Sequence, residues 1–315
     1  MAERESRRIA DRVRGVTSFL TANPQMRLGA PILLVVVLSA VLAPLISPYD
    51  PVEPLDVGPL APPSLEHWFG TDELARDQFS RVLYGGQVSL SVAVLAVSIS
   101  MVAGGILGVV AGYYRGAADA VIMRVMDAMI SFPSLLLALA IGAMLGAGMA
   151  NTMIAVGIVG IPAFARLMRS QTLTIRDFDF VNAARIAGLR DGRIIARHVL
   201  PNGIAPVFVY MATSIAGAIL MQATLAFLGL GATPPTPDWG SMLQSGYGYI
   251  AVSPMLSVGP GVAIVLSTMG FILVGEALGS ALDPKRRRSR PLSTFTGRRT
   301  ARSAEKTEPK EEHRS

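Results

Sequence analysis

The chain has 315 residues, of which 51% are hydrophobic and only 16% are charged, and this composition is too apolar for an ordinary soluble domain. Its net charge of +6 does not indicate nucleic-acid binding, because the arginines gather at the ends of apolar segments rather than on one face. The sequence has no cysteine and three widely spaced histidines, so neither disulfides nor a metal site are expected. We therefore predict an all-α protein embedded in membrane lipid.

Residues 1–27 are polar and basic, and residues 28–49 carry no charge. A secretory signal peptide also places basic residues before an apolar run. Here the run is longer than usual, and Pro44 stands directly after the point where cleavage would be needed. The pattern therefore favours a retained transmembrane helix over 28–48. An acidic, proline-rich segment follows over 49–85, and we expect it outside the membrane.

Residues 82–114 are also free of charge and predict a second spanning helix over about 88–112. Gly104, Gly108 and Gly112 recur every four residues on one face of this helix. Such spacing lets two membrane helices pack backbone against backbone. Glycine is common in membrane helices for other reasons too, but three in register favour close packing.

A charge-free run over 128–165 is nearly twice the ~20 residues that one spanning helix needs. Small residues from Gly142 to Asn151 interrupt it, so we expect two helices there rather than one. Residues 281–315 read as a charged, disordered tail. The apolar runs after the second helix predict helices over about 128–147, 151–168, 203–228 and 257–279.

The basic residues are distributed asymmetrically about these six helices. With both termini inside, 26 of the 28 lysines and arginines fall in inside segments, and only Arg76 and Arg81 lie outside. Five or seven helices would leave one basic terminus outside. The sequence therefore predicts a multi-pass protein of the plasma (inner) membrane, with a cytoplasmic basic segment over 1–27 and a cytoplasmic tail over 281–315.

The loop between the fourth and fifth helices, residues 169–202, is water-exposed because its arginines are costly to place in lipid. The sequence predicts a helix over 181–187 that ends at Gly188, where a left-handed residue is favoured. Asp191 is expected to cap a second helix, and Pro201 to begin the next one. Small side chains on the first helix would let another protein approach closely. The alternative is an amphipathic interfacial helix without a partner.

Several of these residues also carry a family resemblance. Asn182-Ala183-Ala184, Gly188 and Leu200-Pro201 resemble the Glu-Ala-Ala…Gly…Leu-Pro loop of ATP-binding-cassette (ABC) importer permeases. Asn182 departs from this pattern, since the family usually has glutamate there, and any salt bridge of that glutamate is absent. Segments that are similar to the dipeptide, oligopeptide and nickel branch of the family are 67–85, 193–202, 227–240 and 281–287.

This resemblance implies a type I ABC importer permease fold over about 86–280, in which the 177–201 loop couples the chain to an ATPase. It also implies a sister permease that completes a heterodimer, two ATPase subunits, and an extracytoplasmic solute-binding protein. The solute would be a di- or oligopeptide or a related small molecule. The aromatic residues of the loop, Phe178 and Phe180, have an alternative role, which is packing against the chain's own helices. The implied ATPase-coupling residues are Phe178, Phe180, Val181, Asn182, Ala183, Ala184, Gly188, Leu200 and Pro201.

The sequence gives no sign that the chain itself catalyses a reaction. It has no G-x-x-x-x-G-K-[ST] motif for ATP, so we expect no cofactor, no catalytic residues and no enzymatic activity of its own. Its expected helix centres lack the ionisable residues that ion-coupled carriers often keep. No convergent constellation indicates a membrane enzyme. The first hypothesis is the permease of an ATP-driven importer, and the second is a secondary transporter or channel subunit.

Overall fold

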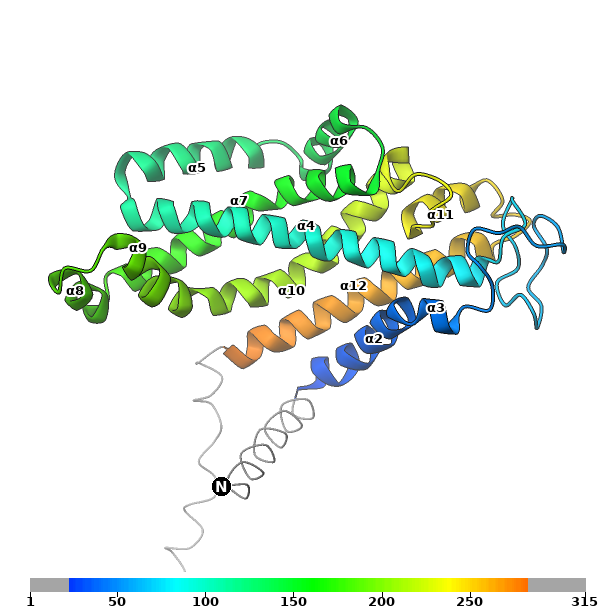
Figure 1. The fold of residues 1–315 in the computed structure, drawn as a ribbon, viewed down its shortest axis with the longest axis horizontal. Helices are drawn as coiled ribbons and strands as arrows, with labels where there is room; N and C mark the ends of the chain where they lie inside the picture. Colours follow the sequence, from blue (N-terminus) through cyan, green and yellow to red (C-terminus); the bar gives the residue numbers. More distant parts are fainter. Residues whose placement is uncertain (1–22, 283–315) are drawn as a thin grey trace, which may run out of the picture. The chain divides into compact units, whose positions relative to one another are not determined.

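The computed structural model describes residues 23–282, and its regular elements in this range are helices (Figure 1). Residues through Gly279 form one unit by their contacts. Most of the expected basic segment 1–27 and of the tail 281–315 lies outside the described range. The helices are α2 (Pro24–Val41), α3 (Ala43–Ile46), α4 (Gln78–Tyr114), α5 (Gly116–Ile130), α6 (Ser134–Leu145), α7 (Met149–Arg176), α8 (Asp179–Ile186), α9 (Asp191–Ile194), α10 (Leu200–Leu225), α11 (Trp239–Tyr247) and α12 (Met255–Leu282), with π-helical turns η1 (Ile195–Val199) and η2 (Ala226–Leu230).

Five described helices are long and apolar enough to cross a membrane, and the pair α5–α6 makes a sixth if it is counted as one span. This agrees with the prediction of a helical, multi-pass protein. The other predicted helices overlap the observed ones: 28–48 with α2 and α3, 88–112 with α4, 151–168 with α7, 203–228 with α10 and η2, and 257–279 with α12.

The prediction of one helix over 128–147 is wrong. The chain bends by 93° between α5 and α6, and the break lies at residues 131–133. Pro133 explains it, because a proline disfavours helical geometry in the residue before it and offers no N–H of its own. The charge-free run that motivated the prediction shows which residues can lie in lipid, but it does not show where a helix is interrupted.

Two further boundaries differ from expectation on the side of the molecule that holds α11. The helix expected over about 88–112 begins earlier, at Gln78, because Asp77 caps α4 by accepting a hydrogen bond from the backbone N–H of Ser80 at 2.8 Å. The connection between the helices expected over 203–228 and 257–279 also contains a helix, α11. Asp238 caps α11, accepting from the N–H groups of the next turn at 2.9 and 3.0 Å.

The central contact of the unit is between α4 and α7, which run side by side (Figure 1). Gly104, Gly108 and Gly112 lie at this contact. A Cβ added at Gly104 would stand 2.5 Å from the carbonyl oxygen of Ile161, and one at Gly112 would stand 2.8 Å from Cβ of Thr172. The two backbones therefore approach as closely as the glycine spacing predicts, and the contact leaves no room for side chains.

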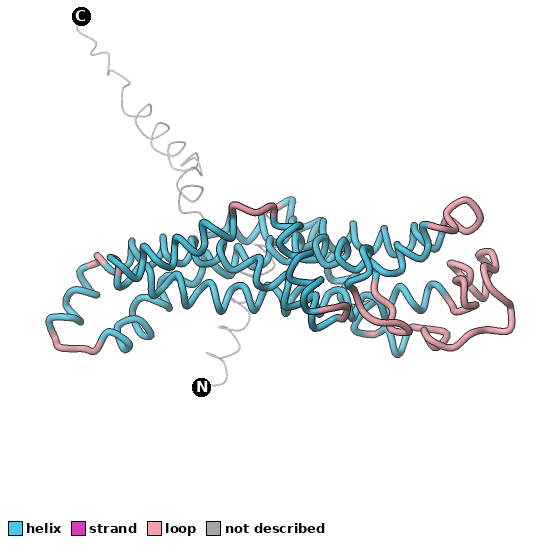
Figure 2. The backbone as a smooth tube through the Cα atoms, turned by 90° about the horizontal axis from the view of Figure 1, so that it is seen from above, coloured by secondary structure: helices cyan, strands magenta, loops and turns pink. Residues whose placement is uncertain are grey.

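Most loops gather at the two ends of the helices (Figure 2). At one end lie α8 and α9, next to the end of α4 (Figure 1). At the other end lie α11 and the segment over 47–77, beside the start of α4 (Figure 1). Functional features are therefore to be sought at each end and among the spanning helices between them.

Candidate functional site

The segment expected to dock on another protein forms α8, which follows α7 after a turn of two residues. α8 ends as predicted, since Gly188 has a φ of +79°. The N–H of Leu189 donates to the carbonyl of Ala184 at 3.2 Å, and the N–H of Gly188 donates to that of Arg185 at 3.0 Å. This pair of bonds is the Schellman motif, which requires a left-handed residue at the position of Gly188.

One face of α8 packs against the rest of the chain. Val181 is fully buried and belongs to a small apolar cluster with Ile175, Ile194 and Val199. Ala184 is half-buried and packs against the same cluster. The expected docking role of Val181 is therefore corrected: its side chain fixes α8 to the rest of the chain and is not free to contact a partner.

The opposite face of α8 is open. Phe178 and Phe180 are 47% and 42% exposed, with ring centroids 5.7 Å apart. Ile186, which was not among the predicted docking residues, is 88% exposed. A helical wheel that places Val181 inward would have found it, because position 186 then points outward. The exposed residues at helical spacing, which we call the open face of α8, are Asp179, Asn182, Ala183 and Ile186.

The second part of the loop differs from expectation. Arg190 holds the N-cap position of α9, whereas Asp191 is its first residue. The helix then continues from α9 through η1 into α10, so Pro201 does not start a separate helix. A proline inside a continuous helix lacks a donor and crowds the carbonyl four residues earlier, and the wider π-helical turn of η1 relieves this. Leu200 and Pro201 are exposed but belong to α10 rather than to α8.

The loop is tied to the end of α4 through Tyr113, which is 4% exposed. Its hydroxyl donates to the carboxylate of Asp191 at 2.7 Å. The guanidinium groups of Arg176 and Arg185 lie 5.7 and 5.9 Å from the centroid of its ring, within cation–π range. The interaction with Tyr113 raises the pKa of Arg185.

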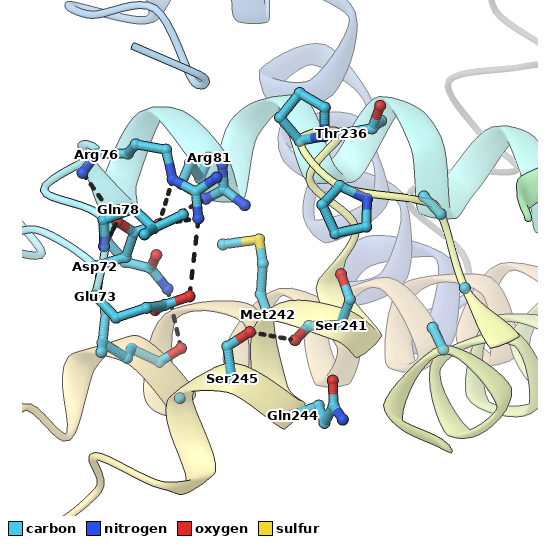
Figure 3. Close-up of a pocket in the computed structure, with 18 of the residues that line it drawn as sticks. Asp72, Glu73, Arg76, Gln78, Arg81, Thr236, Ser241, Met242, Gln244 and Ser245 are labelled. Carbon is cyan, nitrogen blue, oxygen red and sulfur yellow. Dashed lines mark hydrogen bonds and ion pairs between the residues drawn. The ribbon is translucent and has the colours of Figure 1, made fainter. Parts of the chain in front are cut away.

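A cavity of about 300 Å³, the α11 cavity, lies among α11, the connection before it and the start of α4 (Figure 3). Arg76 and Arg81, the two arginines that the charge count placed outside, line it and are each 7% exposed. Asp72 pairs with both, at 2.6 and 3.3 Å, and the Arg81 guanidinium also donates to the carbonyl of Pro51 at 2.7 Å. The guanidinium groups of both arginines are thus paired with groups of the same chain.

A second cavity, of about 390 Å³, lies among the spanning helices α4, α6, α7 and α10. We call it the hydroxyl-lined cavity. No charged side chain lines it among the described residues, and the same residues contain no group of three or more histidine, aspartate or glutamate side chains that could hold a metal. Its hydroxyl-bearing residues are Ser100, Ser134, Tyr210, Thr213 and Ser214.

Comparison with known proteins agrees with this architecture. Residues 104–288 match the family of binding-protein-dependent transport system inner membrane components. The chain is 42% identical over 266 residues to the dipeptide transport system permease protein of Alkalihalophilus pseudofirmus, covering 84% of this chain and 88% of that protein. It is 47% identical over 255 residues to the glutathione transport system permease protein of Escherichia coli, covering 81% and 84%.

The fold is also found in a crystal structure of an amino acid ABC transporter with histidines. That match has a TM-score of 0.50 at 15% identity and covers 64% of this chain and 94% of the other. At this identity the structural match supports a shared fold only, whereas the sequence matches cover most of the chain at much higher identity. On these grounds the chain belongs to the inner-membrane permease components of binding-protein-dependent ABC transport systems.

Proposed function

We propose that this chain is the permease subunit of an ABC importer for dipeptides or other short peptides, and that it forms half of the translocation pore. Two of its relatives are named for transport of a dipeptide and of glutathione, and glutathione is itself a tripeptide. The observation that carries the proposal is the open face of α8, an exposed helical surface on a chain that has no ATP-binding motif of its own.

One of the ATPase subunits docks on this open face from the cytoplasm. Ile186 on this face and Phe178 and Phe180 beside it supply exposed apolar surface, and burying a large apolar side chain contributes about 1.5–3 kcal/mol. Ala183 keeps the backbone accessible between them. The cytoplasmic placement is supported by the distribution of lysine and arginine, 26 of 28 on one side.

The complete importer contains a sister permease that forms a heterodimer with this chain, two ATPase subunits and an extracytoplasmic solute-binding protein. Each supplies a function that this chain lacks: the other half of the pore, the hydrolysis of ATP and the selection of solute. α11 and the segment over 47–77, at the end of the unit away from α8 (Figure 1), form the side that receives the binding protein.

The hydroxyl-lined cavity is the part of the path that contacts the solute. Ser100 donates to the carbonyl of Gly157 at 2.6 Å, while Thr213 and Ser214 donate to that of Tyr210 at 3.0 and 2.7 Å. Since these protons are committed to the backbone, the hydroxyl oxygens are left as acceptors. These oxygens can accept hydrogen bonds from the N–H groups and the ammonium group of a short peptide. Because the lining is uncharged, it binds the peptide only weakly and can release it.

Reconstitution tests the proposal. In proteoliposomes that hold the four subunits and a binding protein loaded with a labelled dipeptide, uptake should require ATP, and it should cease when either the ATPases or the binding protein are left out. The chain alone should neither hydrolyse ATP nor accumulate the dipeptide. Uptake by the chain alone under a proton gradient would instead support a secondary transporter.

A further inference from the structure

Three segments of the loop region meet on one side chain of α4. Tyr113 contacts Arg176 at the end of α7, Arg185 on α8 and Asp191 at the start of α9. Arg176 also donates to the backbone carbonyl of Tyr113. The tyrosine ring is buried in the same cluster as Val181. Through Tyr113, α4 therefore makes polar contact with the segments before and after α8.

We expect the fold to persist without the hydroxyl group of Tyr113. The carboxylate of Asp191 belongs to an exposed residue, so water can replace the tyrosine hydroxyl as its donor. The aromatic ring, by contrast, fills space in the apolar cluster. Removing the hydroxyl while keeping the ring should thus release α9 from α4 without opening the cluster.

A displacement at Tyr113 can reach the hydroxyl-lined cavity through α4. The helix runs unbroken from Tyr113 back to Ser100, which lines that cavity, a length of about 20 Å at 1.5 Å per residue. Along this length the glycine contact with α7 leaves little room for α4 to deform separately. Close-packed contacts of this kind transmit shifts rather than absorb them.

We propose that Tyr113 is a positioning residue that transmits the movement of α8 and α9 to α4, and through it to the hydroxyl-lined cavity. The inference rests on the proposed function of the loop as the ATPase-docking element. It assigns the coupling between hydrolysis and transport to the bond from the Tyr113 hydroxyl to Asp191, whereas the open face of α8 provides binding. Loss of this bond should uncouple the transporter, not dissociate it.

The test compares Tyr113→Phe with Tyr114→Phe in the reconstituted complex. Tyr114 is the neighbouring residue and is 54% exposed, so its substitution is a matched control. Tyr113→Phe should assemble normally and hydrolyse ATP, while the peptide imported per ATP hydrolysed falls by roughly two- to thirtyfold. Tyr114→Phe should leave this ratio unchanged. An unchanged ratio in Tyr113→Phe, or its failure to assemble, would overturn the inference.

A double-mutant cycle separates this bond from a general effect of the ring. Asp191→Ala should lower the same ratio as Tyr113→Phe does, and the double variant should be no worse than either single one. Asp191→Asn keeps an acceptor oxygen and should retain most of the ratio. Additive losses would overturn the inference. If the unmodified complex shows no ATP-driven uptake, the proposed function itself fails, which is a separate result from an unaltered ratio in the variants.

Discussion

Val181 and Ile186 lie on opposite sides of α8: the first is fully buried in the chain, and the second is 88% exposed. The same short helix is therefore anchored by one apolar side chain and presents another to the surroundings. An isoleucine held in water by a well-ordered helix costs free energy that a partner would recover on binding. The proposed docking of an ATPase subunit on α8 requires such a helix, fixed on one side and open on the other.

Ile186→Ser should weaken binding of the ATPase subunits. If Ile186 is buried in the complex, its loss should lower the affinity about tenfold or more, because burial of such a side chain contributes about 1.5–3 kcal/mol. Co-purification of the ATPases, normalised to the amount of permease in the membrane, measures this. Ile250→Ser is the control, since Ile250 is also exposed, at 52%, but follows α11 rather than α8. Equal losses in the two variants would argue against docking on α8.

Gly188→Ala should impair transport but not membrane insertion. The φ of +79° at Gly188 is strained for any residue with a Cβ, at a cost of about 1–2 kcal/mol, and the spanning helices lie elsewhere. Gly192→Ala is the matched control, because Gly192 stands in α9 without a positive φ and has open space around it. Uptake per permease should fall in Gly188→Ala and persist in Gly192→Ala. Equal uptake in both variants would mean that the end of α8 is not critical.

Gly108→Val should destabilise the protein through the contact of α4 with α7. An added side chain at Gly108 would meet the backbone of α7, whereas at Gly105, on the same helix, nothing lies within 4 Å. Overpacking of this kind costs about 1–3 kcal/mol. Gly108→Val should therefore lower the thermal stability of the purified protein, and Gly105→Val should not. Similar melting temperatures would show that the two helices separate readily.

The helices of this fold could be predicted from the sequence because lipid demands long apolar runs, and charge marks their ends. The features that were not predicted depend on helix breaks and short helices, which apolar runs do not reveal. The break at Pro133 lies inside a charge-free run, and α11 is formed by a glycine- and serine-rich stretch that resembles a loop.

The candidate site was predicted in part. The left-handed Gly188 follows from local sequence, since glycine is the residue that ends helices in this way. The burial of Val181 does not, because it depends on which way α8 faces, and this is decided by contacts with distant residues such as Tyr113. The bond from Tyr113 to Asp191 joins residues 78 positions apart, a separation at which no local pattern is informative.

The orientation of the chain predicts a difference in labelling. Because the sequence has no cysteine, single cysteines can be introduced without background reaction. Leu65→Cys, at a site that is 97% exposed, should react with a membrane-impermeant maleimide on cells whose inner membrane is intact. Any outer membrane is first made permeable to the reagent. Gly192→Cys should react only after the inner membrane is opened. The reverse pattern would place α8 outside and remove the basis for its docking on an ATPase.

The central claim is that an ATPase subunit sits on the open face of α8, and cross-linking from Ala183 tests it most directly. Ala183→Cys carries a small, exposed side chain in the middle of that face and can bear a short photoreactive group. In membranes that contain the assembled transporter, this group should cross-link to an ATPase subunit in high yield, and the same group at Leu65 should not. Active uptake without any cross-link from Ala183 to an ATPase would contradict the account.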